Sequence, residues 1–385
     1  MKIVYVYPEF TTLAGTERVL IDKMNYLANL EGFEVVVITH EQGNHPFVYP
    51  LSSKVTHVDL NVRFLTLYRY NILVRLIKRK RYKKLLVVKF NKLISDIRPN
   101  IVVATTYHPY ILTLINSSPG HFKKVLESHI DKCYLHSNDP LIKKNLIKRI
   151  RSIRNMNNLI REAGSFDILV SLHHKDAVDW SKYLRTQVII NVVHLNDTAR
   201  ISNQESKHII FVGRYTIQKG IPDLFNIWDI VFHKYPDWHL DLYGDGDIKE
   251  IPYTEEYRKN KNIHVHSSDP DIFSKYIESS IFVLTSLYEP FGLVIVEAMS
   301  CGLPVIAFDC PSGPANIIND GVDGFLIKNR DVDEFAGKLC MLIEYPQLRL
   351  EIGKSAVQSS LRYSAEHVMP QWIKLYNDLL SNSKA

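Results

Sequence analysis

Short apolar runs, most of them rich in β-branched residues, alternate with longer amphipathic stretches along the chain. In the first half these runs are KIVYVY (2–7), EVVVIT (34–39), NIVVATT (100–106), KVLES (124–128), DILVSL (167–172) and QVIIN (187–191). Runs of this length without polar alternation are typical of strands buried on both faces of a parallel sheet. Their alternation with helical stretches predicts a parallel α/β fold.

The same alternation starts again after a polar stretch at 194–207. The runs of the second half are HIIFVGR (208–214), HLDLYG (239–244), NIHVH (262–266), IFVLTS (281–286) and PVIAF (304–308). A chain of 385 residues is long enough for two cores of ordinary size. We therefore predict one α/β domain over 1–196 and a second over 197–365, with a C-terminal helix at 366–385 that packs back on the first.

The composition, with 46% hydrophobic and 23% charged residues, is that of a folded globular protein. No apolar run reaches the roughly 18 residues of a membrane span, and Pro8 and Glu9 come too early for a signal peptide. We therefore expect a cytoplasmic protein. Its cysteines lack the spacing of a disulfide framework or a zinc site, so we expect reduced thiols at Cys133, Cys301, Cys310 and Cys340.

Charge is unevenly distributed between the two halves. Residues 1–200 contain 30 Lys and Arg against 16 Asp and Glu, a net charge of +14, whereas the rest contains 17 against 25, a net charge of −8. The densest basic stretches, Arg75 to Lys84 and Lys143 to Arg154, are interleaved with apolar residues. This combination favours an anionic membrane surface as partner, with a solvated helix face as the alternative. No nucleic-acid-binding motif accompanies the charge, so we expect no nucleic acid partner.

The segment EPFGLVIVEAMSCGLPVIA (289–307) carries the clearest chemical signal. It predicts a loop that leads into a helix, and then a new strand. Unpaired backbone N–H groups at the start of that helix would bind a diphosphate, and they belong to Phe291, Gly292 and Leu293. Glu297, one turn further on, would accept hydrogen bonds from ribose hydroxyls. Glu289, in the loop, would accept them from the hydroxyls of a sugar.

The segment FVGRYTIQKG (211–220) supplies two cations directly after the first strand of the second domain. Gly213 precedes the guanidinium of Arg214, and the ammonium of Lys219 follows five residues later. These cations would neutralise the phosphates of a departing nucleoside diphosphate, which lowers the barrier where negative charge develops in the transition state.

These two segments resemble a known family. Glu289 and Glu297 are the ends of an E-x7-E pattern that, in its full context, is similar to the signature of family 4 glycosyltransferases, retaining enzymes of GT-B fold. The resemblance implies two Rossmann-like domains that face each other across a cleft, with the sugar nucleotide bound by the second. It also implies a catalytic role for Glu289, Arg214 and Lys219. Pro290 departs from the small or aromatic residue usual there, and it should stiffen the loop.

The resemblance extends to the first domain, which is expected to bind the acceptor. Gly15, between the first strand and its helix, is similar to the family's glycine-rich loop, although Ala14 replaces the first glycine and leaves less room for a phosphate. His129 matches the position of a histidine near the reacting centre, and His108 is a rival candidate. Glu17 and Arg18 also match the family pattern. Their alternative role is an interaction on the helix surface.

Other positions are expected around the nucleotide. Gly244, in LYGDGD (242–247), is expected to form a turn beside it, although D-G-D would be a metal site in another glycosyltransferase fold. His266 and Ser267 are expected near the base. Ser312 or Asn316 would cap the helix that follows the strand at 304–308.

The resemblance therefore implies retaining transfer of a hexose, with UDP-hexose as donor, to a saccharide or lipid-linked saccharide. Similar segments in the family belong to enzymes of lipopolysaccharide or capsule synthesis, and membrane docking would place this protein on the inner face of the plasma membrane. We expect no cofactor and no metal. The alternatives are a GT-B epimerase or phosphorylase and a non-catalytic nucleotide-sugar-binding subunit. A glycosidase with paired carboxylates would have no use for Arg214 and Lys219.

Overall fold

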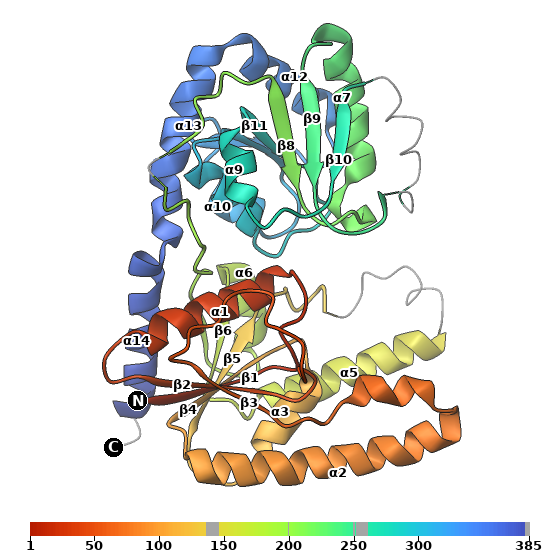
Figure 1. The fold of residues 1–385 in the computed structure, drawn as a ribbon, viewed down its shortest axis with the longest axis vertical. Coiled ribbons are helices and arrows are strands. Elements are labelled where there is room, and N and C mark those ends of the chain that lie inside the picture. The colour runs from red at the N-terminus through yellow and green to blue at the C-terminus, as the bar shows by residue number, and fades with distance from the viewer. Residues whose placement is uncertain (136–145, 199, 249–250, 252–260, 382–385) are drawn as a thin grey trace. The chain divides into compact units, whose positions relative to one another are not determined.

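The computed structural model describes residues 1–135, 146–198, 200–248, 251 and 261–381. The chain forms two compact units, Met1–Val192 with Val368–Ala385, and Val193–His367. Each unit is built on a parallel sheet with helices on both faces (Figure 1). The parallel α/β fold predicted from the sequence is confirmed.

The strands of the first unit lie in the order β3-β2-β1-β4-β5-β6-β7. Their bounds are β1 (Lys2–Val6), β2 (Glu34–Thr39), β3 (Thr56–Asp59), β4 (Ile101–Thr105), β5 (Lys123–Ser128), β6 (Ile168–Ser171) and β7 (Thr186–Val188). The helices are α1 (Gly15–Ala28), η1 (Phe64–Arg69), α2 (Ile72–Ile97), α3 (Pro109–Asn116), α5 (Leu146–Ala163), α6 (His174–Ser181) and α14 (Ala365–Ser381). Apolar side chains of α2, α3 and α5 form one core with the sheet, whereas α1 and the later part of α14 cover the other face (Figure 1).

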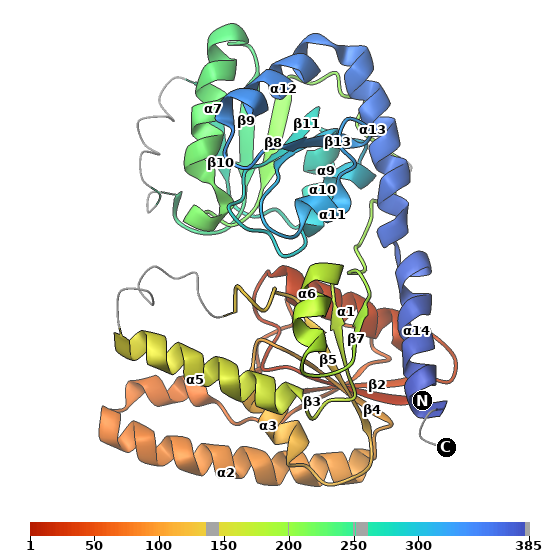
Figure 2. The same cartoon turned by 180° about the vertical axis from the view of Figure 1, so that it is seen from behind.

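The second unit has the strand order β10-β9-β8-β11-β12-β13. Its strands are β8 (His208–Val212), β9 (His239–Tyr243), β10 (Ile263–His266), β11 (Ile281–Leu284), β12 (Val305–Phe308) and β13 (Gly324–Ile327). Its helices are η2 (Ile217–Lys219), α7 (Ile221–Lys234), α9 (Ile272–Ile277), α10 (Leu293–Ser300), α11 (Pro314–Ile317), α12 (Val332–Glu344), α13 (Pro346–Ser360) and η4 (Leu361–Tyr363). Helices α7 and α12 pack together, and α10 packs against α9, α11 and α13 (Figure 2).

Each predicted apolar run corresponds to a strand. Strand β2 has the predicted bounds, and β1 and β4 to β12 differ from theirs by a few residues. The strands β3 and β13 were not predicted. The sequence of β3 is THVD, in which no residue is fully buried, and β13 is a GFLI segment that follows a turn. Both are edge strands. The apolar signal of β3 is weak, whereas β13 is apolar but only four residues long.

Candidate functional site

The clearest cluster of predicted residues lies where the strand order of the second sheet reverses. Strands β8 and β11 are neighbours at this point, and ligands of open α/β sheets bind outside the carboxyl ends of such strands. Lys219, from the loop after β8, has its Nζ 2.5 Å from Oε2 of Glu289, from the loop after β11. These side chains are only 12% and 11% exposed. The structure thus joins two residues that the sequence placed in separate motifs.

The two loops are fixed against each other by their backbones. Gly220 has φ of 65°, and a Cβ at this position would lie 1.8 Å from the carbonyl oxygen of Thr285. The Thr285 hydroxyl donates to the carbonyl of Lys219 at 3.1 Å, and the Gln218 side chain donates to the carbonyl of Tyr288 at 3.1 Å. Because only glycine fits at position 220, the close approach of the loops depends on it. This contact sets the position of Lys219 beside Glu289.

Arg214 and the glycines around it lie at the end of the same strand. The side chain of Arg214 is exposed and forms no salt bridge with any residue that the structure describes. A Cβ on Gly244 would lie 1.9 Å from the carbonyl oxygen of Gly213, and the Lys219 stem packs within 3.5 Å of the Cβ position of Gly213. Close backbone packing therefore explains both glycines. Their role beside a nucleotide stays a prediction.

The loop after β11 enters α10 as predicted. Gly292, with φ of 101°, caps a helix that begins at Leu293. Phe291 is buried, and a Cβ on Gly313 would lie 2.1 Å from its carbonyl oxygen, so this glycine allows the neighbouring loop to approach. Glu297 is 4% exposed and accepts a hydrogen bond from Tyr276 at 3.3 Å.

The predicted cap of the following helix is wrong. Helix α11 begins at Pro314 with Gly313 at the cap position, and it has no side-chain cap hydrogen bond. Ser312 precedes the cap with φ of 87°, and Asn316 lies inside the helix, where its side chain donates to the carbonyl of Ser312. Pro314 stands at the first position of this helix, where its missing N–H leaves no backbone partner unsatisfied.

The residues expected near a base already have contacts. The ring of His266 stacks on Tyr243 with 4.4 Å between centroids, and its Nε2 lies 3.2 Å from Oδ1 of Asp241. Ser267 is exposed. Asp245, of the D-G-D segment, accepts a hydrogen bond from Ser268 at 2.6 Å. Within the described ranges, no group of three or more His, Cys, Asp or Glu is arranged to hold a metal ion.

In the first unit, Gly15 lies differently from the prediction. It is the first residue of α1 rather than part of the preceding loop. Ala14, with an extended backbone, takes the cap position, so the helical backbone begins one residue earlier than expected. Glu17 is 8% exposed and accepts hydrogen bonds from Tyr7 at 3.2 Å and Thr12 at 3.0 Å. A helix-surface role for Glu17 is therefore wrong.

Both candidate histidines follow strands of this unit. His129 is buried directly after β5, and its carbonyl accepts a hydrogen bond from Tyr107 at 3.4 Å. His108 caps α3 after β4, and its ring lies 5.3 Å from that of Tyr7. Burial lowers the pKa of His108 to about 4, so its imidazole is neutral at physiological pH.

Three buried polar atoms belong to residues at the ends of β1, β4 and β5, which are adjacent in the sheet. These atoms have no hydrogen-bond partner among the described residues, and they are Oε2 of Glu17, Oγ1 of Thr106 and Nδ1 of His129. Thr106 and His129 directly follow β4 and β5, and Glu17, on α1, is bonded to Tyr7, which follows β1. Buried polar groups without partners are costly unless water or a ligand satisfies them. Ordered water or a polar ligand is therefore expected here. Thr106 and Tyr107 were not predicted as site residues, although the polar end of the run NIVVATT (100–106) was a usable signal.

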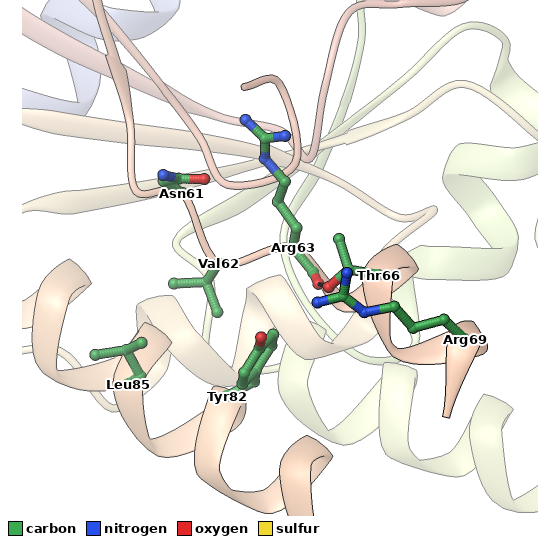
Figure 3. Close-up of a pocket in the computed structure, with 7 residues that line it drawn as sticks. All are labelled: Asn61, Val62, Arg63, Thr66, Arg69, Tyr82 and Leu85. Atoms are coloured by element: carbon green, nitrogen blue, oxygen red, sulfur yellow. Dashed lines mark hydrogen bonds between the residues drawn. The ribbon is translucent and has the colours of Figure 1, made fainter. Parts of the chain in front are cut away.

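A separate pocket lies where η1 meets α2, and none of its lining residues is a predicted site residue. Its volume is about 400 Å³, and it is lined by Asn61, Val62, Arg63, Thr66, Arg69, Tyr82 and Leu85. Figure 3 shows the guanidinium of Arg69 beside Thr66, whereas the guanidinium of Arg63 points away from both. The pocket therefore combines a cation with the apolar side chains of Val62 and Leu85.

The basic run at 75–84 lies in the first half of α2. Every residue from Ile72 to Leu85 is at least partly exposed, including large apolar side chains. The most exposed of these are Ile72 (71%), Leu73 (74%), Leu76 (55%) and Ile77 (58%). Lys143 and Lys144 of the second basic run lie outside the described residues. No described helix has the length and apolar character needed to cross a membrane.

The comparisons with known proteins agree with this arrangement. The family described as "Glycosyl transferases group 1" matches residues 196–359. An uncharacterised glycosyltransferase of Haemophilus influenzae is 24% identical over 96% of this chain and 98% of its own. An amylovoran biosynthesis glycosyltransferase of Erwinia amylovora is 30% identical over 56% of this chain and 61% of its own. An uncharacterised glycosyltransferase of Methanocaldococcus jannaschii is 30% identical over 64% of this chain and 67% of its own.

Solved structures show the same fold. The crystal structure of TarM superposes with a TM-score of 0.78 at 16% identity, over 98% of both chains. That of HepE from Anabaena in complex with UDP-glucose superposes with a TM-score of 0.69 at 18% identity, over 99% of this chain and 100% of the other. The fold is GT-B, with two Rossmann-like units. By its fold and its relatives, the chain belongs to the group 1 glycosyltransferases.

Proposed function

We propose that the protein is a retaining hexosyltransferase that moves a sugar from a nucleotide to a saccharide or lipid-linked saccharide. The observation that carries this proposal is the Lys219–Glu289 pair at the strand-order reversal of the second sheet. It puts a cation for the diphosphate and a carboxylate for the sugar in direct contact. Glu297 and the N-terminus of α10 follow in the same segment, for the ribose and the diphosphate.

The proposed reaction proceeds on one face of the sugar. The bond between C1 of the sugar and the diphosphate oxygen breaks, and the acceptor oxygen forms its bond to C1 on the same side. The proton of the acceptor hydroxyl goes to a diphosphate oxygen. Arg214 and Lys219 stabilise the charge of the leaving group, so positioning and electrostatics supply most of the catalysis.

The relatives support a donor and a setting for this proposal. We propose UDP-hexose as donor, which the UDP-glucose complex of HepE supports, and polysaccharide synthesis, which the amylovoran relative supports. The polar cluster of Glu17, Thr106 and His129 would bind the acceptor in the first unit. No cofactor or metal is required in this proposal, because the two cations balance the diphosphate.

The test is turnover of a panel of UDP-, GDP- and ADP-hexoses with saccharide acceptors, and NMR of the product. The expected product of an α-linked donor has an α linkage; a β linkage would exclude retention. Release of epimerised sugar or sugar phosphate would favour the alternative enzymes, and nucleotide-sugar binding without turnover would favour a binding subunit. EDTA should leave the rate unchanged. Loss of activity that Mg²⁺ or Mn²⁺ restores would instead make Asp245 and Asp247 candidate ligands.

We also propose that the first half of α2 docks on an anionic membrane from the cytoplasmic side. Ile72, Leu73, Leu76 and Ile77 are exposed beside the basic run at 75–84. Exposed apolar side chains on one helix with this many cations are characteristic of interfacial helices. Arg69, in the adjacent pocket, would add a contact to a lipid phosphate.

A further inference from the structure

A fully buried ion pair lies behind His129. Nζ of Lys23, on α1, is 2.5 Å from Oε1 of Glu127, on β5. The other carboxylate oxygen, Oε2, is 3.0 Å from Nε2 of His129. The side chains of Lys23 and Glu127 are 1% and 2% exposed, and that of His129 is 4% exposed. The three groups form one chain of contacts that leads from the helix to the strand end.

The charges of Lys23 and Glu127 depend on each other. Burial raises the pKa of Glu127, but Lys23 and His129 outweigh burial and hold that pKa below its usual value. Burial lowers the pKa of Lys23 to about 8, although Glu127 opposes this shift. Both groups are therefore ionised at neutral pH. Nζ of Lys23 also lies 3.2 Å from the ring centroid of Trp372, on α14, so an aromatic face stabilises the ammonium from another side.

The contacts between Lys23, Glu127 and His129 determine which nitrogen of His129 carries the proton. An ionised carboxylate only accepts hydrogen bonds, so Nε2 beside Glu127 must be the donor. In a neutral imidazole, Nδ1 is then an acceptor, and the partner of one nitrogen sets the state of the other. Nδ1 is buried and has no hydrogen-bond partner among the described residues. Nδ1 is therefore the one nitrogen of this ring that is left to bind a further group.

We propose that Glu127 and Lys23 are positioning residues that fix His129 in the Nε2–H form and present Nδ1 as acceptor to a substrate hydroxyl. This inference rests on the proposed glycosyl transfer, because the hydrogen bond to Nδ1 would come from a hydroxyl of the sugar or of the acceptor. An ion pair with only a structural role would stabilise the unit without affecting the tautomer of His129.

The test combines ¹⁵N NMR of histidine-labelled protein with steady-state kinetics. In the wild type at pH 7, where Lys23 and Glu127 are both ionised, we expect the neutral His129 ring to give the signals of an Nε2–H imidazole. Glu127→Gln keeps the size of the side chain but allows its amide to donate, so a second population protonated on Nδ1 should appear. With a UDP-hexose, kcat should fall at least tenfold while KM for the donor changes less than twofold. If the single variant does not fold, the neutral double variant Lys23→Met/Glu127→Gln serves instead.

The matched control is Asp131→Asn, which removes the carboxylate partner of His173. That pair is also buried, with Oδ1 of Asp131 2.7 Å from Nε2 of His173. The Tm of the control should fall by about as much as that of Glu127→Gln, but its kcat should stay within twofold of the wild-type value. An Nδ1–H form of His129 in the wild type, or equal losses of kcat in Glu127→Gln and Asp131→Asn, would overturn the proposal. If the wild type turns over no sugar nucleotide, the proposed function fails, whereas the tautomer is still measured by NMR.

Discussion

Nζ of Lys219 lies 2.5 Å from Oε2 of Glu289, although the two residues are 70 positions apart in the chain. The Ser286 hydroxyl also donates to this carboxylate oxygen at 3.3 Å. A sugar nucleotide that binds here would contact both side chains, with its phosphate near the Lys219 ammonium and its sugar near the Glu289 carboxylate. The pair therefore holds each side chain in place before the substrate arrives.

Replacement of either cation should reduce turnover with little effect on folding. For Arg214→Ala and Lys219→Ala we expect kcat to fall on the order of 10²-fold, the loss typical for a group that stabilises charge in the transition state. The control is Lys207→Ala, since Lys207 is an exposed lysine of the same unit that pairs with Asp237. Steady-state kinetics with a UDP-hexose measures the effect. Unchanged rates in both variants would remove the cations from the mechanism.

The two glutamates should separate nucleotide binding from sugar binding. Glu297→Ala should weaken binding of UDP alone by about 1.5–3 kcal/mol, because the ribose loses a charged acceptor. Glu289→Ala should leave UDP binding nearly unchanged and weaken binding of the sugar nucleotide. Calorimetry with each ligand checks this, with Glu278→Ala as an exposed acid of the same unit for control. Equal losses of UDP affinity would contradict the division of roles.

The stability of the first unit should fall in mild acid. Burial, and after it the neighbouring His108, lowers the pKa of His40 to about 4 from the ordinary 6.5. Because the unfolded chain binds this proton more tightly, the stabilisation is complete above pH 6.5 and is lost as the pH falls towards 4. The difference corresponds to about 3 kcal/mol for this one group.

Thermal unfolding between pH 7 and 4 measures this effect. His40→Gln should flatten the dependence of Tm on pH, and His233→Gln, at a residue with a side chain 72% exposed, should not. Parallel curves for the wild type and His40→Gln would show that His40 does not titrate in this range.

Membrane docking should depend on both charge and apolar contact. Each cation close to an anionic bilayer contributes about 1 kcal/mol, and the attraction falls off over a Debye length of about 8–10 Å. The protein should float with anionic vesicles at low salt and be released by high salt. It should not float with neutral vesicles.

Two variants and a control test this surface. Binding should be lost in the variant with Ser at Lys78, Arg79, Lys80 and Arg81, and it should weaken in Leu73→Ser/Ile77→Ser. The control removes as many cations elsewhere, with Ser at Arg200, Lys207, Lys234 and Lys354, which are all exposed. Equal binding of the control and the 78–81 variant would show that the basic run is only a solvated helix face.

Most of the helices and strands, and the chemistry of the loops, were predictable from the sequence alone. Strands such as β2 and β12 were predictable because burial on both faces requires continuous apolar runs, and α10 was predictable because Gly292 and Gly302 mark its ends. The motifs around Arg214 and Glu289 indicated a glycosyltransferase because each is contained in one short segment.

Which side chains meet depends on how the elements pack, and this was not predictable from the sequence. The Lys219–Glu289 pair joins two loops that come together because β8 and β11 are neighbours in the sheet. The Lys23–Glu127 pair joins a helix and a strand 104 positions apart. Periodicity reports whether a residue is buried, but not which residue it is buried against, since that depends on strand order and helix packing. For this reason the sequence identified His129 as a candidate, and only the fold revealed the buried charges that hold it.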